Sequence, residues 1–209
     1  GTTVVTPLLS FFRQNGFKVG VAILSFIFLF KIGEAFMGKM SIIFYKEVGF
    51  SKSDIAIYSK GLGWLVTVGA SLLGGYIVIR SGVVKALFVA GLFMASTNLF
   101  FSILAWAGKV EWLFALAVLV DDLAAAIATV IFVAFISMLV DRNYTATQYA
   151  LLASIGTLGR TLLASSSGLM VDWLDGNWGV FFIITALMVI PSLVLLILIG
   201  KKLVFFKNN

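Results

Sequence analysis

Long apolar runs separated by short polar connections dominate this 209-residue chain. Each run has about 20 to 30 residues, enough for an α-helix to cross a bilayer at about 1.5 Å of rise per residue. The pattern predicts six membrane-spanning helices, and the connections between them are too short to hold a soluble domain. The predicted spans are residues 18–44, 54–79, 85–107, 111–140, 146–171 and 178–199.

A shorter amphipathic segment, VVTPLLSFFRQNGF, precedes the first run at residues 4–17. Its apolar residues alternate with polar ones in a way that predicts a helix lying on the membrane surface. We therefore divide the chain into a lead-in or linker at 1–17, a unit of six helices at 18–200 and a basic tail at 201–209.

The composition agrees with an integral membrane protein and excludes several other classes. Hydrophobic residues make up 61% of the chain and charged residues 11%, and the mean hydropathy is +1.12, well outside the averages of soluble domains. The net charge of +6 is scattered between apolar runs, so it indicates topology and not a nucleic-acid partner. Because the chain contains no cysteine and no histidine, we expect no metal, no cofactor and no enzymatic activity.

The distribution of lysine and arginine among the connections predicts the orientation. The more basic side is expected to face the cytoplasm, and it holds both termini. One side carries Arg13, Lys18, Arg80, Lys85, Arg142, Lys201, Lys202 and Lys207, and the other carries Lys46, Lys52 and Lys109.

Several ionisable residues fall inside the predicted spans, where a charge costs several kcal/mol and marks a functional-site hypothesis. Lys31 and Glu34 are three residues apart and share one helix face. Asp121 and Asp122 are adjacent and point about 100° apart, so one is expected to line a cavity and the other to pair with a neighbouring helix. With Arg160, which lies near the middle of its helix, they predict a belt of charges near the bilayer midplane.

The acidic members of the belt are candidates for proton coupling. A carboxylate surrounded by hydrocarbon holds a proton more readily than one in water, as a proton carrier requires. Glu34, Asp121 and Asp122 are these candidates. The structural alternatives are an ion pair between Glu34 and Lys31 within one helix, and polar contacts between helices for the aspartates.

The basic members, with one amide, are candidates for binding an anionic substrate. The planar fork of Arg160 suits a carboxylate or a phosphate, and Lys31 adds a second cation. Gln148 is expected either to hydrogen-bond a sugar or to bridge helices. For Arg160 the structural alternative is a fixed salt bridge to Asp121 or Asp122.

The connection GGYIVIRSGVVK at residues 74–85 resembles the loop signature of major-facilitator transporters. Gly75, Arg80, Gly82 and Lys85 match the glycine, the Arg-x-Gly core and the basic residue of that signature, whereas its acidic position is Ile79 here. The four matching residues are candidates for a gating loop. The alternative is a tight turn that carries positive charges on the cytoplasmic side.

Further motifs along the chain are FFRQNG at 11–16, KIGEA at 31–35, VGFSK at 48–52, and YTATQYALL at 144–152 followed by Gly159-Arg160-Thr161. Together they resemble the AmpG family of muropeptide permeases, over nearly the whole chain and in the C-terminal half of that family.

The resemblance implies an all-α integral membrane fold, the six-transmembrane-helix half of a major-facilitator transporter with two inverted three-helix repeats. Residues 18–107 and 111–200 show no clear similarity to each other, so the equal number of helices is the support for such repeats. The implied activity is proton symport by alternating access. The implied cargo is N-acetylglucosaminyl-anhydromuramyl fragments, recycled from peptidoglycan across the bacterial inner membrane.

The implied partners are membrane lipid, an anionic glycopeptide, protons, and an N-terminal half of six helices in the same or a separate chain, or else a second copy of this chain. Nucleic acid is not among them. Two alternatives stay open at this point. One is the same fold carrying acetyl-coenzyme A or another anionic or sugar solute, and the other is a membrane scaffold that transports nothing.

Overall fold

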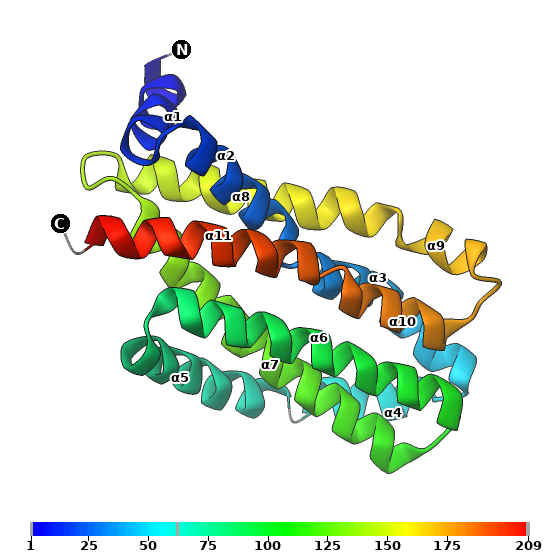
Figure 1. Cartoon of the computed structure of the whole chain (residues 1–209). Helices are drawn as coiled ribbons and strands as arrows, with labels where there is room; N and C mark the ends of the chain where they lie inside the picture. The colour runs from blue at the N-terminus through cyan, green and yellow to red at the C-terminus, as the bar shows by residue number, and fades with distance from the viewer. Residues whose placement is uncertain (1, 62, 208–209) are drawn as a thin grey trace.

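The computed structural model describes residues 2–61 and 63–207, with the side chains of residues 4–58, 61 and 63–203. The described residues form helices and short connections, without strands. Most of the long helices run side by side, and both termini lie at one end of the bundle (Figure 1). The helices are α1 (Thr2–Asn15), α2 (Phe17–Leu29), α3 (Ile32–Val48), α4 (Lys52–Ala56), the π-helix η1 (Ile57–Gly61), α5 (Gly63–Ser81), α6 (Val83–Ala107), α7 (Glu111–Leu139), α8 (Thr145–Ser165), α9 (Ser167–Trp173), α10 (Trp178–Leu187) and α11 (Ile190–Lys207).

Five of the six predicted spans are confirmed by length and apolarity. They are Phe17–Val48, Gly63–Ser81, Val83–Ala107, Glu111–Leu139 and Trp178–Leu203. The remaining prediction, residues 146–171, forms α8 and most of α9, which are helical but less apolar. Polar residues such as Thr157, Arg160 and Thr161 lower the apolarity of α8. Because α8 packs along α2 and α3 within the bundle, its polar residues form one face of a helix and do not indicate a loop.

Four predicted spans are not single helices, contrary to the prediction from the sequence. The first is interrupted at residues 30–31 and the last at 188–189. The span 54–79 divides into α4, η1 and α5, and the span 146–171 divides into α8 and α9. Pro191 explains the interruption at 188–189, because proline lacks an N–H and its ring crowds the carbonyl four residues earlier. At residues 30–31 the backbone of Lys31 leaves helical geometry (φ −96°, ψ 19°) and begins α3.

The core consists of two buried clusters of aliphatic and aromatic side chains, one toward each end of the bundle. In the first, Phe30 stacks on Phe132 with ring centroids 5.4 Å apart. In the second, Phe44 meets the edge of Phe182 at 4.8 Å. Close packing of this kind, together with polar contacts between helices, holds helices together in lipid.

A polar layer separates the two buried clusters. Thr97 donates a hydrogen bond to Asp121 Oδ1 (3.1 Å), which joins α6 to α7. Asn98 donates to Thr185 Oγ1 (3.1 Å), which joins α6 to α10. Interhelical hydrogen bonds of this type are worth about 1 kcal/mol each in membranes, so the layer fixes the register of three helices.

The predicted lead-in helix exists as α1, and it packs on the end of the bundle. Phe11 is 1% exposed. Ser10 Oγ donates a hydrogen bond to Asp141 Oδ2 (2.7 Å) in the connection between α7 and α8. Hydrogen bonds from the Asn143 N–H and from Ser10 lower the pKa of Asp141 below its ordinary value. The carboxylate of Asp141 is therefore the charged form that accepts the hydrogen bond from α1.

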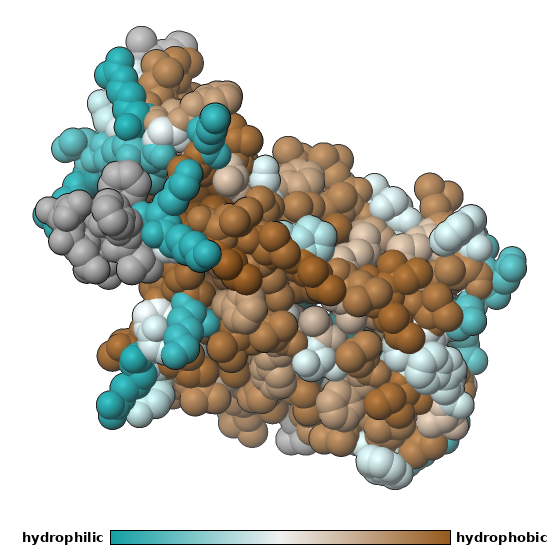
Figure 2. Space-filling view, viewed as in Figure 1, coloured by the Kyte–Doolittle hydropathy of each residue, from teal (hydrophilic) through white to brown (hydrophobic). Residues whose placement is uncertain are grey.

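The outer surface is that of a protein embedded in lipid. Figure 2 shows a broad apolar band across the molecule, with hydrophilic residues gathered mainly at the end where α1 and the C-terminus lie. Large apolar side chains such as Leu72, Leu169 and Leu198 are more than half exposed. An apolar surface of this extent is stable in hydrocarbon and not in water, so the chain is a multi-pass membrane protein.

Candidate functional site

The interruption between α2 and α3 positions the first two charges of the site. Lys31 is the N-cap residue of α3, and Glu34 lies in the first turn of that helix. The unpaired N–H groups of a helix N-terminus favour a carboxylate there. Glu34 Oε2 lies 3.0 Å from Lys31 Nζ, so the ion pair within one helix that the spacing predicted is present.

The second cation comes from another helix. Arg160 Nη2, on α8, lies 3.9 Å from Glu34 Oε1. The structural alternative predicted for Arg160 was a salt bridge to Asp121 or Asp122, and the structure pairs it with Glu34 instead. Two cations therefore share one carboxylate, and the cluster of Lys31, Glu34 and Arg160 keeps a net positive charge.

A close approach between backbones makes this pairing possible. A Cβ on Gly159 would overlap the carbonyl oxygen of Phe28, so only glycine lets α8 pack this tightly against α2. The next residue along α8 is Arg160. The glycine thus brings the guanidinium within reach of the interruption that carries Lys31 and Glu34.

The three charges differ in how much they are exposed. The side chains of Lys31 and Glu34 are 15% and 21% exposed, whereas that of Arg160 is 53% exposed. Lys31 is held further by a hydrogen bond that its Nζ donates to Thr129 Oγ1 on α7 (2.7 Å). Arg160 has the weaker attachment and the freer guanidinium, so it is the cation best placed to meet a solute.

One oxygen of the cluster is unsatisfied. Glu34 Oε2 is buried and receives no hydrogen bond of good geometry from the described residues, although Lys31 Nζ is near. Buried carboxylate oxygens are normally hydrogen-bonded, and an exception calls for an explanation. The ammonium of Lys31, 3.0 Å away, supplies the compensating charge.

The cluster opens onto a small cavity of about 180 Å³ between α2, α7 and α8. Lys31, Arg160, Tyr149 and Thr157 are its polar lining, and Phe132 is part of its apolar wall. A second, more open hollow of about 660 Å³ continues along α8 and shares Tyr149 and Thr157 with the first. Both hollows follow the polar face that makes α8 less apolar than the other spans.

The two aspartates point to different helices, whereas the expectation that one of them lines a cavity stays a prediction. Asp121 accepts the hydrogen bond from Thr97 on α6. Asp122 faces α5, where a Cβ on Gly63 would lie 3.4 Å from its Oδ2. Neither aspartate lines the two hollows or forms an ion pair with a side chain that the structure describes. Their role in proton coupling stays a prediction.

Gln148 has a structural position in the described fold. It is 2% exposed. Its Nε2 donates a hydrogen bond to the carbonyl of Pro7 (2.8 Å), and its Oε1 accepts one from the Asp141 N–H (2.6 Å). Of the two alternatives for this amide, the structure favours a bridge between α1 and the start of α8 over contact with a sugar.

The predicted gating loop is a tight turn. Gly82 is the single residue between α5 and α6, and its φ of 79° is one that glycine adopts without strain. Arg80 lies over the ring of Tyr76, with 5.6 Å between the guanidinium carbon and the ring centroid. A Cβ on Gly75 would meet open space, and Lys85 is exposed in the first turn of α6. Gating by these residues stays a prediction.

Sequence reasoning missed two hydroxyl groups that hold the charges, those of Thr97 and Thr129. Each of them contacts a charge on another helix: Thr129 of α7 accepts a hydrogen bond from Lys31, and Thr97 of α6 donates one to Asp121. No pattern along the chain indicates either contact. Among the described residues, no group of three or more acidic, histidine or cysteine side chains is placed to hold a metal ion.

Comparisons with known proteins find relatives that are named as transporters or permeases. The chain is 31% identical over 199 residues to the putative transporter AmpG 4 of Rickettsia felis, covering 95% of this chain and 47% of the relative. It is 29% identical over 207 residues to the anhydromuropeptide permease of Escherichia coli K12, covering 99% of this chain and 41% of that protein. The chain thus spans about half the length of the curated relatives it matches. No family model matches it.

Proposed function

Because the chain belongs to the AmpG family of permeases, which are major-facilitator transporters, we propose that it forms one half of a proton-driven muropeptide importer. The proposal assigns it to the C-terminal half of six helices, with α8 and α9 as the fifth span. The cargo is N-acetylglucosaminyl-anhydromuramyl fragments, and the membrane is the bacterial inner membrane with both termini in the cytoplasm. The N-terminal half, or a second copy, supplies the opposite wall.

The observation that carries the proposal is the net positive cluster beside two connected hollows. A muropeptide brings carboxylates and sugar rings, and the described lining offers a partner for each. Arg160 and Lys31 suit the carboxylates, the ring of Tyr149 suits stacking on a sugar, and Thr157 offers a hydroxyl group. The smaller cavity, of about 180 Å³, is below the usual size of a ligand pocket. A cavity of this small size is expected if the chain forms only one wall of a larger cavity.

The cluster also suggests how a proton is coupled to the substrate. While Glu34 is ionised, its carboxylate is paired with both Lys31 and Arg160. A proton on Glu34 neutralises this carboxylate and releases Lys31 and Arg160 for the carboxylate of the substrate. Proton and substrate then stabilise the same loaded state, and the two halves rock between inward and outward openings. Asp121 in the polar layer and Asp122, which faces α5, remain further candidates for coupling.

Uptake by inner-membrane vesicles that contain the full-length protein tests the proposal. We expect labelled N-acetylglucosaminyl-anhydromuramyl peptide to accumulate when a proton gradient is imposed and not when the gradient is collapsed. An excess of acetyl-coenzyme A is expected to leave uptake unchanged. Competition by acetyl-coenzyme A would move the cargo to that solute, and the absence of uptake with either compound would favour a scaffold that transports nothing.

A further inference from the structure

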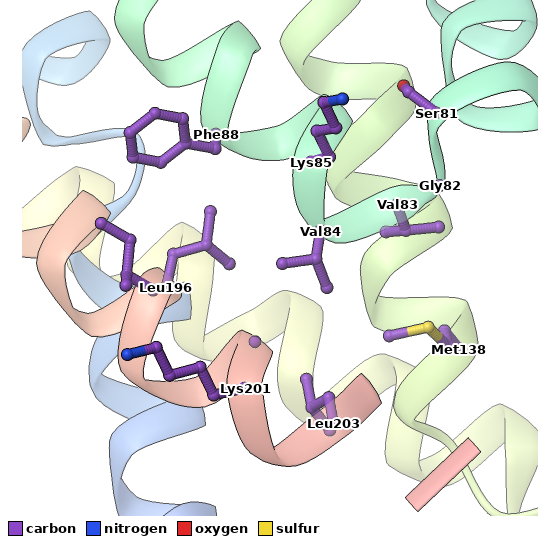
Figure 3. Close-up of a pocket in the computed structure, with 12 residues that line it drawn as sticks. Ser81, Gly82, Val83, Val84, Lys85, Phe88, Met138, Leu196, Lys201 and Leu203 are labelled. Atoms are coloured by element: carbon purple, nitrogen blue, oxygen red, sulfur yellow. The ribbon is translucent and has the colours of Figure 1, made fainter. Parts of the chain in front are cut away.

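A cavity of about 660 Å³ lies between the start of α6 and the end of α11, and none of its lining belongs to the charged cluster (Figure 3). Its walls are mainly apolar. Among the lining side chains are Val83, Val84, Phe88, Met138, Leu196 and Leu203, from α6, α7 and α11. Of its lining residues, Gly82 and Lys85 belong to the predicted gating loop. The proposed function gives no role to the apolar residues of its walls.

Two lysines lie at the edge of this apolar cavity. Lys85 of α6 and Lys201 of α11 both line it, and both are exposed (Figure 3). The N-terminus of α6 lies beside them, and its N-cap residue, Gly82, gives no side-chain hydrogen bond to the N–H groups of the first turn. Such groups attract an anion. The described lining contains no acidic residue to oppose this attraction.

The cavity is continuous with the apolar outer surface. Ile197 lines it and is 47% exposed, and Val194 and Leu198 on the same helix are 50% and 58% exposed. These apolar walls would pack favourably against the acyl chain of a lipid, but they offer no favourable contact to a hydrated anion. The two lysines lie at the end of the bundle that carries most of the basic connections, and anionic lipids gather beside such segments.

We propose that this cavity binds an anionic phospholipid. Its phosphate lies at the N-terminus of α6 between Lys85 and Lys201, and an acyl chain follows the apolar wall past Phe88 and Leu196. The bound lipid joins α6 to α11 next to a tight contact between them, where a Cβ on Gly200 would lie 2.8 Å from Val84 Cγ1. It also contacts the turn at Gly82, so the lipid composition is expected to influence that turn.

Native mass spectrometry of the full-length protein in neutral detergent, with equal amounts of phosphatidylglycerol and phosphatidylcholine, tests the site. We expect the wild type to retain phosphatidylglycerol preferentially. The double variant K85A/K201A is expected to retain about thirtyfold less of it, since each of the two lysines that line the cavity adds about 1 kcal/mol of attraction for the bound phosphate. Retention of phosphatidylcholine is expected to stay the same.

Two further variants make the result specific. The control K18A/R142A removes the same charge from exposed residues outside the cavity, and it is expected to retain phosphatidylglycerol like the wild type. Ile197→Trp fills the apolar wall without changing any charge, and it is expected to lower retention. Equal retention of both lipids by the wild type, equal loss in the control, or displacement of the lipid by inorganic phosphate alone would overturn the proposal.

Discussion

Arg160→Ala is expected to lower muropeptide uptake to about one hundredth of the wild-type rate or less. The guanidinium is 53% exposed beside the cavity and is tied only loosely, at 3.9 Å, to Glu34. Charge-assisted hydrogen bonds to a carboxylate are worth about 1.5 to 3 kcal/mol each, so loss of a bidentate pair corresponds to a factor of 100 or more. Initial uptake rates in vesicles, corrected for the amount of protein in the membrane, measure the effect.

Two further variants show whether the effect comes from the planar guanidinium of Arg160 or from the loss of a positive charge. Arg160→Lys keeps the positive charge and is expected to retain a fraction of the uptake, because an ammonium cannot make the paired contact. Arg142→Ala removes the same side chain from the connection between α7 and α8 and is expected to transport normally. Near-normal uptake by Arg160→Ala would show that Arg160 serves only the packing of the helices.

Glu34→Gln is expected to abolish the dependence of uptake on the proton gradient. The amide has nearly the shape of the carboxylate but neither ionises nor carries the proton that the proposed coupling requires. Accumulation driven by the gradient should fall at least about tenfold, a typical effect of losing a coupling free energy of 1 to 3 kcal/mol. Exchange of labelled for unlabelled substrate across the membrane should survive, because it needs no net proton movement.

The controls for this variant are two other acidic residues. Glu111→Gln changes an exposed carboxylate at the start of α7 and is expected to leave the gradient dependence intact. Asp121→Asn tests the other candidate, whose carboxylate is held by Thr97. Should Asp121→Asn lose the gradient dependence while Glu34→Gln keeps it, coupling belongs to the polar layer and not to the charged cluster.

The positions of the helices could be predicted from the sequence because lipid imposes a simple rule. Every backbone polar group in hydrocarbon must be paired within its own helix, so long apolar runs become helices. The rule does not say where a helix is interrupted. The break at 188–189 has a visible cause in Pro191. The break before α3 has no such signal in the sequence, and Lys31 and Glu34 there contact side chains from α7 and α8.

The charges of the site could be predicted individually, but most of their partners could not. The spacing of Lys31 and Glu34 within one helix fixes their contact, and the structure confirms it. The pairing of Arg160 with Glu34 depends on the packing of α8 against α2 at Gly159, which no pattern along the chain reveals. Gln148 was ambiguous for the same reason, because its partners Pro7 and Asp141 lie on separate segments.

The most direct test is the reactivity of a thiol placed at Thr157, which lines both hollows next to the charged cluster. This chain contains no cysteine, so Thr157→Cys in a cysteine-free full-length protein gives a single reporter here. The control is Ser96→Cys, an exposed residue of α6 that lines neither hollow and, like Thr157, hydrogen-bonds to the carbonyl four residues earlier.

If the cluster faces an aqueous substrate cavity, T157C reacts with a membrane-impermeant thiol reagent, muropeptide slows that reaction, and S96C reacts slowly with or without muropeptide. If T157C reacts no faster than S96C, or reacts at the same rate with saturating muropeptide, the cluster does not line the path of the substrate.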